Sequence, residues 1–403
     1  MSKVKLISIT IKINSFNILL IGLSFVFLTI GNCTRNRTEI TLESLLNGSL
    51  YTTSRTYDTT AIFSNLGNNV ILAGYTSLSN EATTFKTAAD SYSQNCANTT
   101  ALQNLQDLWK VNFTKLKSIE IVQFGPAVQG GYYETIDPWP TSYLSNPADT
   151  SAINEFIVGS TTINTSNIAS LNKLAKGLPA IEYLLFDDGT GNSSLISICN
   201  NLTGRRLSFL VSLISDYATN AGSLKNAWSE TGGNFLKELT SAGLGSSFFE
   251  TKKLALDSLI TQMVTVLNNL VDKKLGYPSG LNIASGGTIR ASAIESRYAD
   301  ASMDGLVANL VSLQVFYTGN GGAGISDYVR ATNPILDRKI IFQIEEAISK
   351  SKQVSNLRIS LTSNDLSKIR DAYEAIRALR ITLTTDLSAL SGTGTSTVTG
   401  DGD

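Results

Sequence analysis

The sequence predicts an all-α protein built from two consecutive four-helix-bundle domains. Apolar residues recur at spacings of three and four over long stretches, whereas the alternating pattern typical of strands is nearly absent. The chain has 403 residues, of which 42% are hydrophobic, so it holds enough apolar side chains for two cores. We expect an N-terminal helical bundle over residues 56–231 and a C-terminal helical bundle over residues 232–390.

The N-terminal residues 1–32 are typical of an export signal. Three lysines precede an apolar run from Phe16 to Ile30, which is too short for a comfortable membrane span. The run ends just before Cys33, as in the cleavage site of a bacterial lipoprotein. We expect acylation of Cys33, for example with palmitate, to anchor the protein to a lipid bilayer of the bacterial envelope. The outer membrane is the expected location, on its periplasmic or its surface face; the alternative is an uncleaved anchor helix.

A polar tether over residues 33–55 precedes the first bundle. Apolar spacing predicts helices over about 62–92 and 102–116, and a Gly-Pro pair follows the second helix. The prolines of residues 127–165 indicate a long irregular crossover.

The third predicted helix runs from about Ser166 to Phe186. We expect a break near Lys176 and Gly177 and a restart that places Pro179 in a first helical turn, where its missing N–H costs nothing. A fourth helix is predicted from about 194 to 228.

The second half repeats this plan with four further apolar stripes. They predict helices over about 256–270, 294–316, 340–348 and 366–390. The tail over residues 391–403 is rich in Gly, Thr and Asp, and we expect it to be disordered.

Composition excludes several classes of chemistry. The chain contains no histidine, the usual general base near neutral pH and the commonest metal ligand. A Ser-His-Asp triad and a His-containing zinc site are therefore excluded, while carboxylate catalysis and cation binding by oxygen ligands remain. The 32 basic and 33 acidic residues nearly cancel, so no nucleic-acid partner is expected.

One motif carries a family resemblance. The segment from Gly177 to Phe186 resembles the signature of the imelysin-like family, Gly-x-His-x-x-Glu followed by Tyr-Leu-Leu-Phe, except that Pro179 stands at the His position and Glu182 at the Glu position. In that family the His and the Glu would share one helix face and jointly hold a metal ion. In this degenerate motif of Gly177, Pro179 and Glu182, the Glu is the remaining ligand.

Further motifs extend the resemblance from about Trp109 to Tyr317. They are Trp109 itself, Glu120 shortly before Phe-Gly-Pro, and Glu295 followed by Ser296. The resemblance implies that Glu120, Glu182 and Glu295 line one pocket between the bundles, where family members are proposed to bind iron or an iron carrier.

The residues alone allow a different interpretation of these three carboxylates. Each would be satisfied by a nearby basic side chain, with Arg205, Arg206 and Arg297 available. If an ion does bind, carboxylates without imidazole favour a hard divalent cation over zinc or ferrous iron. The sequence therefore identifies no definite cofactor, and iron or a hard divalent cation stays the candidate.

Cys96 and Cys199 remain once Cys33 carries lipid, and two such thiols in an exported protein usually pair. In a simple up-down bundle they share one end, but Glu120 then lies away from Glu182. A reversed third helix would bring the carboxylates together and separate the thiols. We favour the disulfide, and both arrangements stay open.

These observations together predict a non-catalytic envelope lipoprotein. Because the motif histidine is missing, we expect no enzyme activity and a binding role linked to iron acquisition or to a protein partner, such as a host component. The alternative is a metallopeptidase-like enzyme that acts through carboxylates alone.

Overall fold

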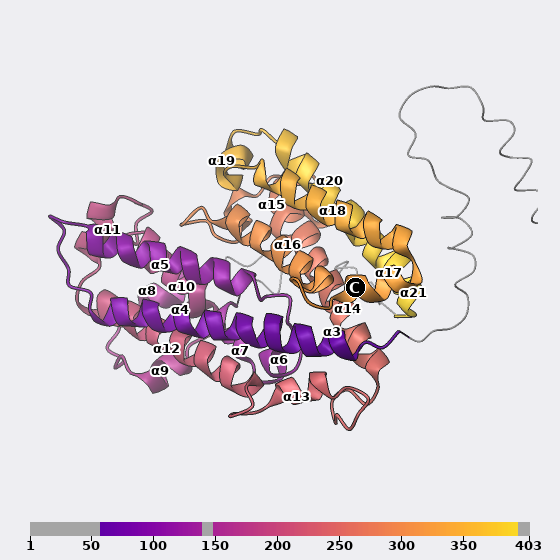
Figure 1. The fold of residues 1–403 in the computed structure, drawn as a ribbon. Coiled ribbons are helices and arrows are strands. Elements are labelled where there is room, and N and C mark those ends of the chain that lie inside the picture. Colours follow the sequence, from indigo (N-terminus) through magenta and orange to yellow (C-terminus); the bar gives the residue numbers. More distant parts are fainter. Residues whose placement is uncertain (1–56, 139–147, 394–403) are drawn as a thin grey trace, which may run out of the picture. The chain divides into compact units, whose positions relative to one another are not determined.

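The computed structural model describes residues 57–138 and 148–393 (Figure 1). The predicted signal peptide, Cys33 and the whole tether lie outside these residues, as does the tail from residue 394 onward. The described residues belong to one compact unit and form helices joined by turns, with no strand in this part of the chain. The predicted all-α class is confirmed.

Four main helical segments make up the first half. Helix α12 packs along α4, α4 packs on α5, and α10 lies against both α5 and α12. Their bounds are Thr60–Asn65 (α3), Leu66–Leu72 (η1) and Ala73–Asp90 (α4) in one continuous segment, then Thr100–Lys117 (α5), Gly177–Phe186 (α10) and Gly204–Trp228 (α12).

The second half also has four main segments, with α18 packed on α16 and α20, and α14 packed on α16 and α20. Helix α16 also contacts α5 and joins the halves. The bounds are Lys252–Asn268 (α14), Asn269–Gly276 (η3) and Tyr277–Ser279 (α15), then Ser302–Thr318 (α16), Pro334–Lys352 (α18), and Ser367–Thr382 (α20), Leu383–Leu387 (η6) and Ser388–Ser391 (α21). This arrangement is compatible with two four-helix bundles, and the division near residue 231 stays a prediction.

Shorter helices connect these segments. Segments η1, η3 and η6 are π-helical, and η2, η4 and η5 are 3₁₀ turns. The remaining bounds are Pro126–Gln129 (α6), Tyr132–Ile136 (α7), Thr150–Val158 (α8), Thr165–Ala169 (α9), Lys173–Ala175 (η2), Leu195–Asn201 (α11), Phe235–Thr240 (α13), Ile283–Ser285 (η4), Ala291–Ala293 (η5), Ile325–Thr332 (α17) and Leu357–Thr362 (α19).

Three expectations about local structure need correction. The described parts of the crossover over 127–165 hold short helices, so that segment is more regular than its prolines suggested. The third predicted helix consists of α9, η2 and α10, with the expected break before Gly177. The stripe that begins at Ile294 is not helical until Ser302, a difference that matters for the site.

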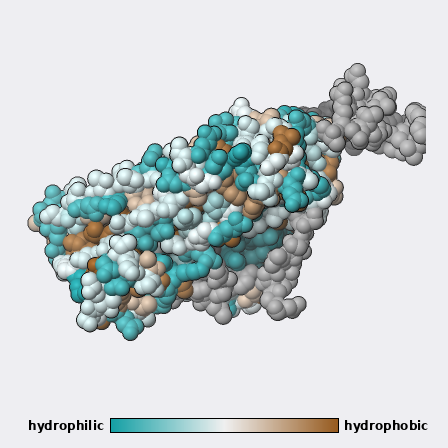
Figure 2. Space-filling view, turned by 90° about the horizontal axis from the view of Figure 1, so that it is seen from below, coloured by the Kyte–Doolittle hydropathy of each residue, from teal (hydrophilic) through white to brown (hydrophobic). Residues whose placement is uncertain are grey.

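On the face shown in Figure 2, hydrophobic residues of the described part of the chain form small separate patches among hydrophilic ones. One described segment, Lys252–Ser285, is long and apolar enough to cross a membrane. Of the most apolar 18 residues of this segment, 56% are buried inside the fold. A core helix has the same length and apolar composition, so this segment is weak support for a membrane span.

Candidate functional site

The motif helix α10 begins at a glycine that other residues could not easily replace. Gly177 has φ +71°, and a Cβ there would lie 2.6 Å from the carbonyl oxygen of Ile136 at the end of α7. Pro179 lies in the first turn, as expected, and every residue of α10 is buried. The glycine thus lets α10 start directly against the segment that carries Asp137.

Trp109 fixes α10 from the other side. Its ring is buried and stacks on Phe113, with 5.0 Å between the centroids, and its Nε1 donates to the carbonyl oxygen of Leu178 at 2.9 Å. Two of the residues that carried the family resemblance, Trp109 and Gly177, therefore position the helix that holds Glu182.

Glu182 is bound by a turn from the second half of the chain. Its Oε1 accepts hydrogen bonds from Ser296 Oγ at 2.8 Å, from the backbone N–H of Tyr298 at 2.9 Å and from that of Ala299 at 2.8 Å. The side chain is 1% exposed. Burial raises the pKa of Glu182 to about 7, although these hydrogen bonds and the charge of Arg297 act in the opposite direction.

This turn exists because residues 294–301 are not helical, contrary to the sequence prediction. Helix α16 begins at Ser302, and Asp300 just before it has φ +57°, which a helix cannot accommodate. The N–H groups of Tyr298 and Ala299 are therefore free of helical hydrogen bonds, and Glu182 accepts both. We call residues 296–299 the Glu182-binding turn.

A second group of buried charges lies beside this turn. Lys117 Nζ contacts Asp137 and lies 2.6 Å from Glu295 Oε1 and 3.3 Å from Glu120 Oε2. The second ammonium group, from Lys274, lies 2.8 Å from Glu120 Oε2 and 3.1 Å from Glu295 Oε1. We call this group the charged cluster; all its members are buried, and they are Lys117, Glu120, Asp137, Lys274, Glu295 and Asn309.

Asn309 completes the contacts of the cluster. Its amide group donates to Glu120 Oε2 at 2.9 Å and accepts from Lys274 Nζ at 2.9 Å. Because Glu120 comes from the first half and Lys274 and Asn309 from the second, the cluster joins the two halves through buried polar contacts.

The charges in the cluster shift one another's pKa values. Desolvation alone would lower the pKa of Lys117, but the carboxylates of Asp137, Glu120 and Glu295 together raise it well above its ordinary value. Desolvation raises the pKa of Glu120, yet Lys117 and Lys274 outweigh it and hold that pKa well below its ordinary value.

Glu295 behaves differently from Glu120. Desolvation raises its pKa, the charges of Lys117 and Lys274 act in the opposite direction, and the neighbouring carboxylates of Glu120 and Asp137 raise the pKa further. Its buried Oε2 has no hydrogen-bond partner among the described residues. Three carboxyl groups face two ammonium groups, and the pKa of Glu295 is raised whereas that of Glu120 is lowered.

The structure brings the predicted site residues together in an unpredicted way. Glu120 and Glu295 share the charged cluster, and Glu182 is connected to it through Ser296, the residue after Glu295. Glu120 and Glu295 have the expected basic partners, which are lysines, and Arg297 acts on Glu182 through its charge, whereas Arg205 and Arg206 donate to backbone carbonyl groups.

Sequence reasoning missed Lys117, Lys274 and Asp137. A signal for both lysines was present, because each continues an apolar helical stripe: Lys117 lies four residues after Phe113, and Lys274 four residues after Leu270. A lysine at such a position is buried and needs an acidic partner.

A disulfide joins Cys96 and Cys199, whose Cα atoms lie 5.5 Å apart. The disulfide that the sequence favoured is therefore present. Glu120 follows the end of α5 and pairs with Lys274 of the second half, and it makes no direct contact with Glu182 among the described residues.

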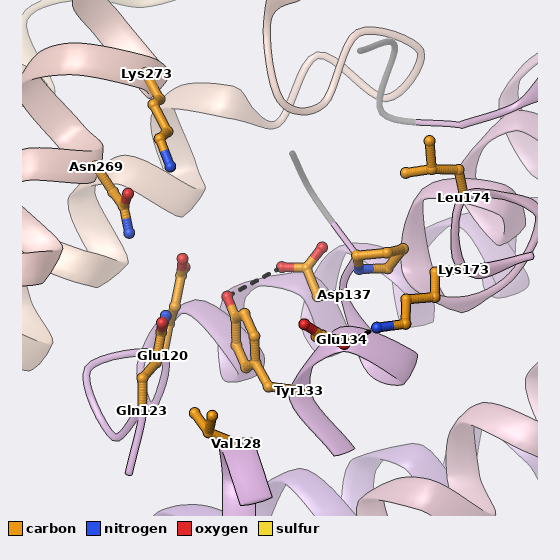
Figure 3. Close-up of a pocket in the computed structure, with 11 residues that line it drawn as sticks. Glu120, Gln123, Val128, Tyr133, Glu134, Asp137, Lys173, Leu174, Asn269 and Lys273 are labelled. Atoms are coloured by element: carbon orange, nitrogen blue, oxygen red, sulfur yellow. Dashed lines mark hydrogen bonds and ion pairs between the residues drawn. The ribbon is translucent and has the colours of Figure 1, made fainter. Parts of the chain in front are cut away.

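A pocket of about 470 Å³ opens beside the charged cluster (Figure 3). Glu120 and Asp137 from the cluster form part of its wall, and the Tyr133 hydroxyl lies 3.5 Å from Asp137 Oδ2. The other lining residues are Gln123, Val128, Glu134, Pro138, Lys173, Leu174, Asn269 and Lys273.

Comparison with known proteins identifies relatives of this fold and sequence. A family model described as imelysin, peptidase M75, matches residues 71–383. A curated relative, iron-regulated protein A from Synechococcus elongatus, is 25% identical over 214 residues. That match covers 52% of this chain and 52% of the relative, so the chain spans about half the length of the curated protein it matches.

Two solved structures share the fold. An iron-regulated protein A precursor from Parabacteroides distasonis has a TM-score of 0.66 at 18% identity and covers 83% of this chain and 94% of its own. An imelysin-like protein from Psychrobacter arcticum has a TM-score of 0.63 at 13% identity and covers 83% and 95%.

Proposed function

Because the chain belongs to the imelysin family, we propose that it is a non-catalytic binding protein of the bacterial envelope with a role linked to iron acquisition. The link to iron is supported by the name of the Synechococcus relative, iron-regulated protein A. The absence of catalysis is supported by the site itself.

The observation that carries this proposal is that every predicted carboxylate ligand already has a partner. Glu182 accepts three hydrogen bonds from the Glu182-binding turn, and Glu120 and Glu295 are paired with Lys117 and Lys274. Pro179 supplies no ligand atom where the family motif has an imidazole. A peptidase metal needs an open coordination position and a bound water, and no described group is arranged to provide them.

The charged cluster does not have the features of a metal site. Single oxygen atoms of Glu120, Asp137 and Glu295 lie within 4.8 Å of one another, which is close enough to share an ion. However, Lys117 and Lys274 already place two ammonium groups against these oxygens, and a divalent cation would have to displace them. We therefore propose that the cargo is a complexed iron species and not a bare ion.

Metal titration tests this proposal. Isothermal titration of the full chain in detergent with ferric, ferrous, calcium and zinc ions is expected to show no tight site, whereas a ferric complex is expected to bind. Crystals that show a transition metal coordinated beside Pro179 would overturn the proposal. So would cleavage of a protein substrate that disappears in Glu182→Ala.

Envelope anchoring through Cys33 is a separate part of the proposal. It is supported by the apolar run that ends just before this cysteine. Cells labelled with a palmitate analogue should incorporate the label into the wild-type protein and not into Cys33→Ser. Equal labelling of both proteins would refute the assignment of the anchor.

A further inference from the structure

One charged side chain of the pocket remains without a partner among the described residues. Glu120 is paired with Lys274, Asp137 with Lys117, and Glu134 with Lys173 at the rim. The fifth charged lining residue, Lys273, is half-buried and makes no hydrogen bond or ion pair within residues 57–138 and 148–393. Lys273 is therefore the charged lining residue that is left without an ion pair in this part of the chain.

The neighbour of Lys273 in sequence, Asp272, is paired with another cation. The carboxylate of Asp272 is held by Arg380, whose Nη1 lies 3.0 and 2.9 Å from its two oxygens. Desolvation lowers the pKa of Lys273, the charge of Asp272 acts in the opposite direction, and the nearby charge of Lys274 lowers the pKa further. Because the lowering effects outweigh that of Asp272, an additional anion would stabilise the ammonium group.

Two adjacent lysines of the π-helical segment η3 serve different sites. Lys274 extends into the charged cluster, while Lys273 and Asn269, four residues apart, line the pocket. Figure 3 shows Lys273 and Asn269 extending from one side of the pocket toward Glu120 and Tyr133 on the other. Isolated π-helical turns are frequent at functional sites, which agrees with this placement.

The remaining lining residues restrict the chemistry of the ligand. The side-chain amides of Gln123 and Asn269 make no hydrogen bond among the described residues, so both are available to hydroxyl or carboxylate oxygens. Val128, Pro138 and Leu174 add apolar surface, which suits a carbon skeleton better than an inorganic anion. The volume of about 470 Å³ lies within the range of small-molecule sites.

We propose that this pocket binds a small hydroxylated organic acid, with a carboxylate on the Lys273 ammonium group and hydroxyl groups on the amides of Gln123 and Asn269. This inference deepens the proposed binding role by naming the class of ligand. It does not depend on iron, because a metal-free acid meets the same groups.

Isothermal titration of the full chain in detergent with metal-free citrate, malate, acetate and inorganic phosphate tests this site. Citrate or malate is expected to bind, and Lys273→Met is expected to weaken binding at least about tenfold, as for the loss of a charged hydrogen bond. Lys273→Arg, which keeps the charge, should retain most of the affinity. Lys368→Met, which removes an exposed lysine outside the pocket, should leave it unchanged.

A chemical readout locates the ligand even if a variant folds poorly. Bound citrate should protect the Lys273 amine of the wild-type protein from acetylation, as measured by mass spectrometry, and leave the reactivity of Lys368 unchanged. Binding of phosphate without binding of any carboxylate would overturn the ligand class, and unchanged acetylation of Lys273 would overturn the site. If metal-free acids bind but ferric complexes do not, the link to iron fails and the pocket assignment stands.

Discussion

Replacing Glu182 with glutamine isolates the energetic consequence of burying this carboxyl group. The variant keeps an acceptor oxygen for Ser296, Tyr298 and Ala299 but has no proton to release. Its stability should therefore differ from that of the wild type by an amount that depends on pH, since every other titrating group is common to the two proteins.

The sign and the size follow from the pKa. Burial raises the pKa of Glu182 from an ordinary value of 4.5 to about 7. A carboxyl group with a raised pKa in the folded state stabilises the protein below its unfolded pKa, and that stabilisation is lost as the pH rises through the folded pKa. The difference in pKa corresponds to about 3 kcal/mol in the free energy of unfolding, lost mainly between about pH 4.5 and pH 7.

Urea unfolding at pH 5 and pH 8, followed by circular dichroism, measures this difference. Between these two values, the wild type should lose up to about 3 kcal/mol relative to Glu182→Gln. In Glu182→Ala the three donors stay buried without an acceptor, at about 1 to 3 kcal/mol each, so that variant should be destabilised at both pH values. Parallel pH dependence of the wild type and Glu182→Gln would refute the raised pKa.

Three further perturbations test the rest of the site. Lys117→Met leaves Asp137 and Glu295 short of a buried counter-ion and should lower the free energy of unfolding by about 3 to 5 kcal/mol, measured in urea against Lys368→Met; a loss below about 1 kcal/mol would contradict the role of the cluster. The double replacement of Cys96 and Cys199 by serine opens a loop of 103 residues and should lower the free energy of unfolding by about 4 to 5 kcal/mol. A reductant should destabilise the wild type and not the double variant, and an equal effect on the two proteins would argue against the bridge. Gly177→Ala should lower the midpoint of thermal unfolding, because the new Cβ would lie 2.6 Å from a carbonyl oxygen and the residue has a positive φ. Gly191→Ala is the control for the positive φ alone, because nothing lies within 4 Å of a Cβ there. Equal midpoints for the two variants would contradict the close contact at Gly177.

The helices could be predicted from the sequence because their signals are local. Apolar stripes located α4, α5, α12 and α20, and the Gly-x-Pro pattern located the start of α10. Family motifs singled out Glu120, Glu182 and Glu295, and the structure places all three at or beside one cluster.

The Glu182-binding turn could not be predicted in the same way. Ile294 and Tyr298 continue the apolar spacing of α16, so the local pattern favours a helix there. The acceptor that replaces the helical hydrogen bonds of this segment is Glu182, more than a hundred residues earlier in the chain. The cluster lysines carry a local signal, but each also pairs with a carboxylate of the other half, Lys117 with Glu295 and Lys274 with Glu120, and no local pattern predicts those pairs.

The short stretch that contains Glu295 and Ser296 serves two buried interactions at once. Glu295 is held by the lysines of the charged cluster, while the next residue reaches Glu182 on the motif helix. Two adjacent residues thus hold the first and second halves together, one through ion pairs and the other through a hydrogen bond. Any motion that separates the halves must break both sets of interactions at the same time, so we expect the separation to be cooperative.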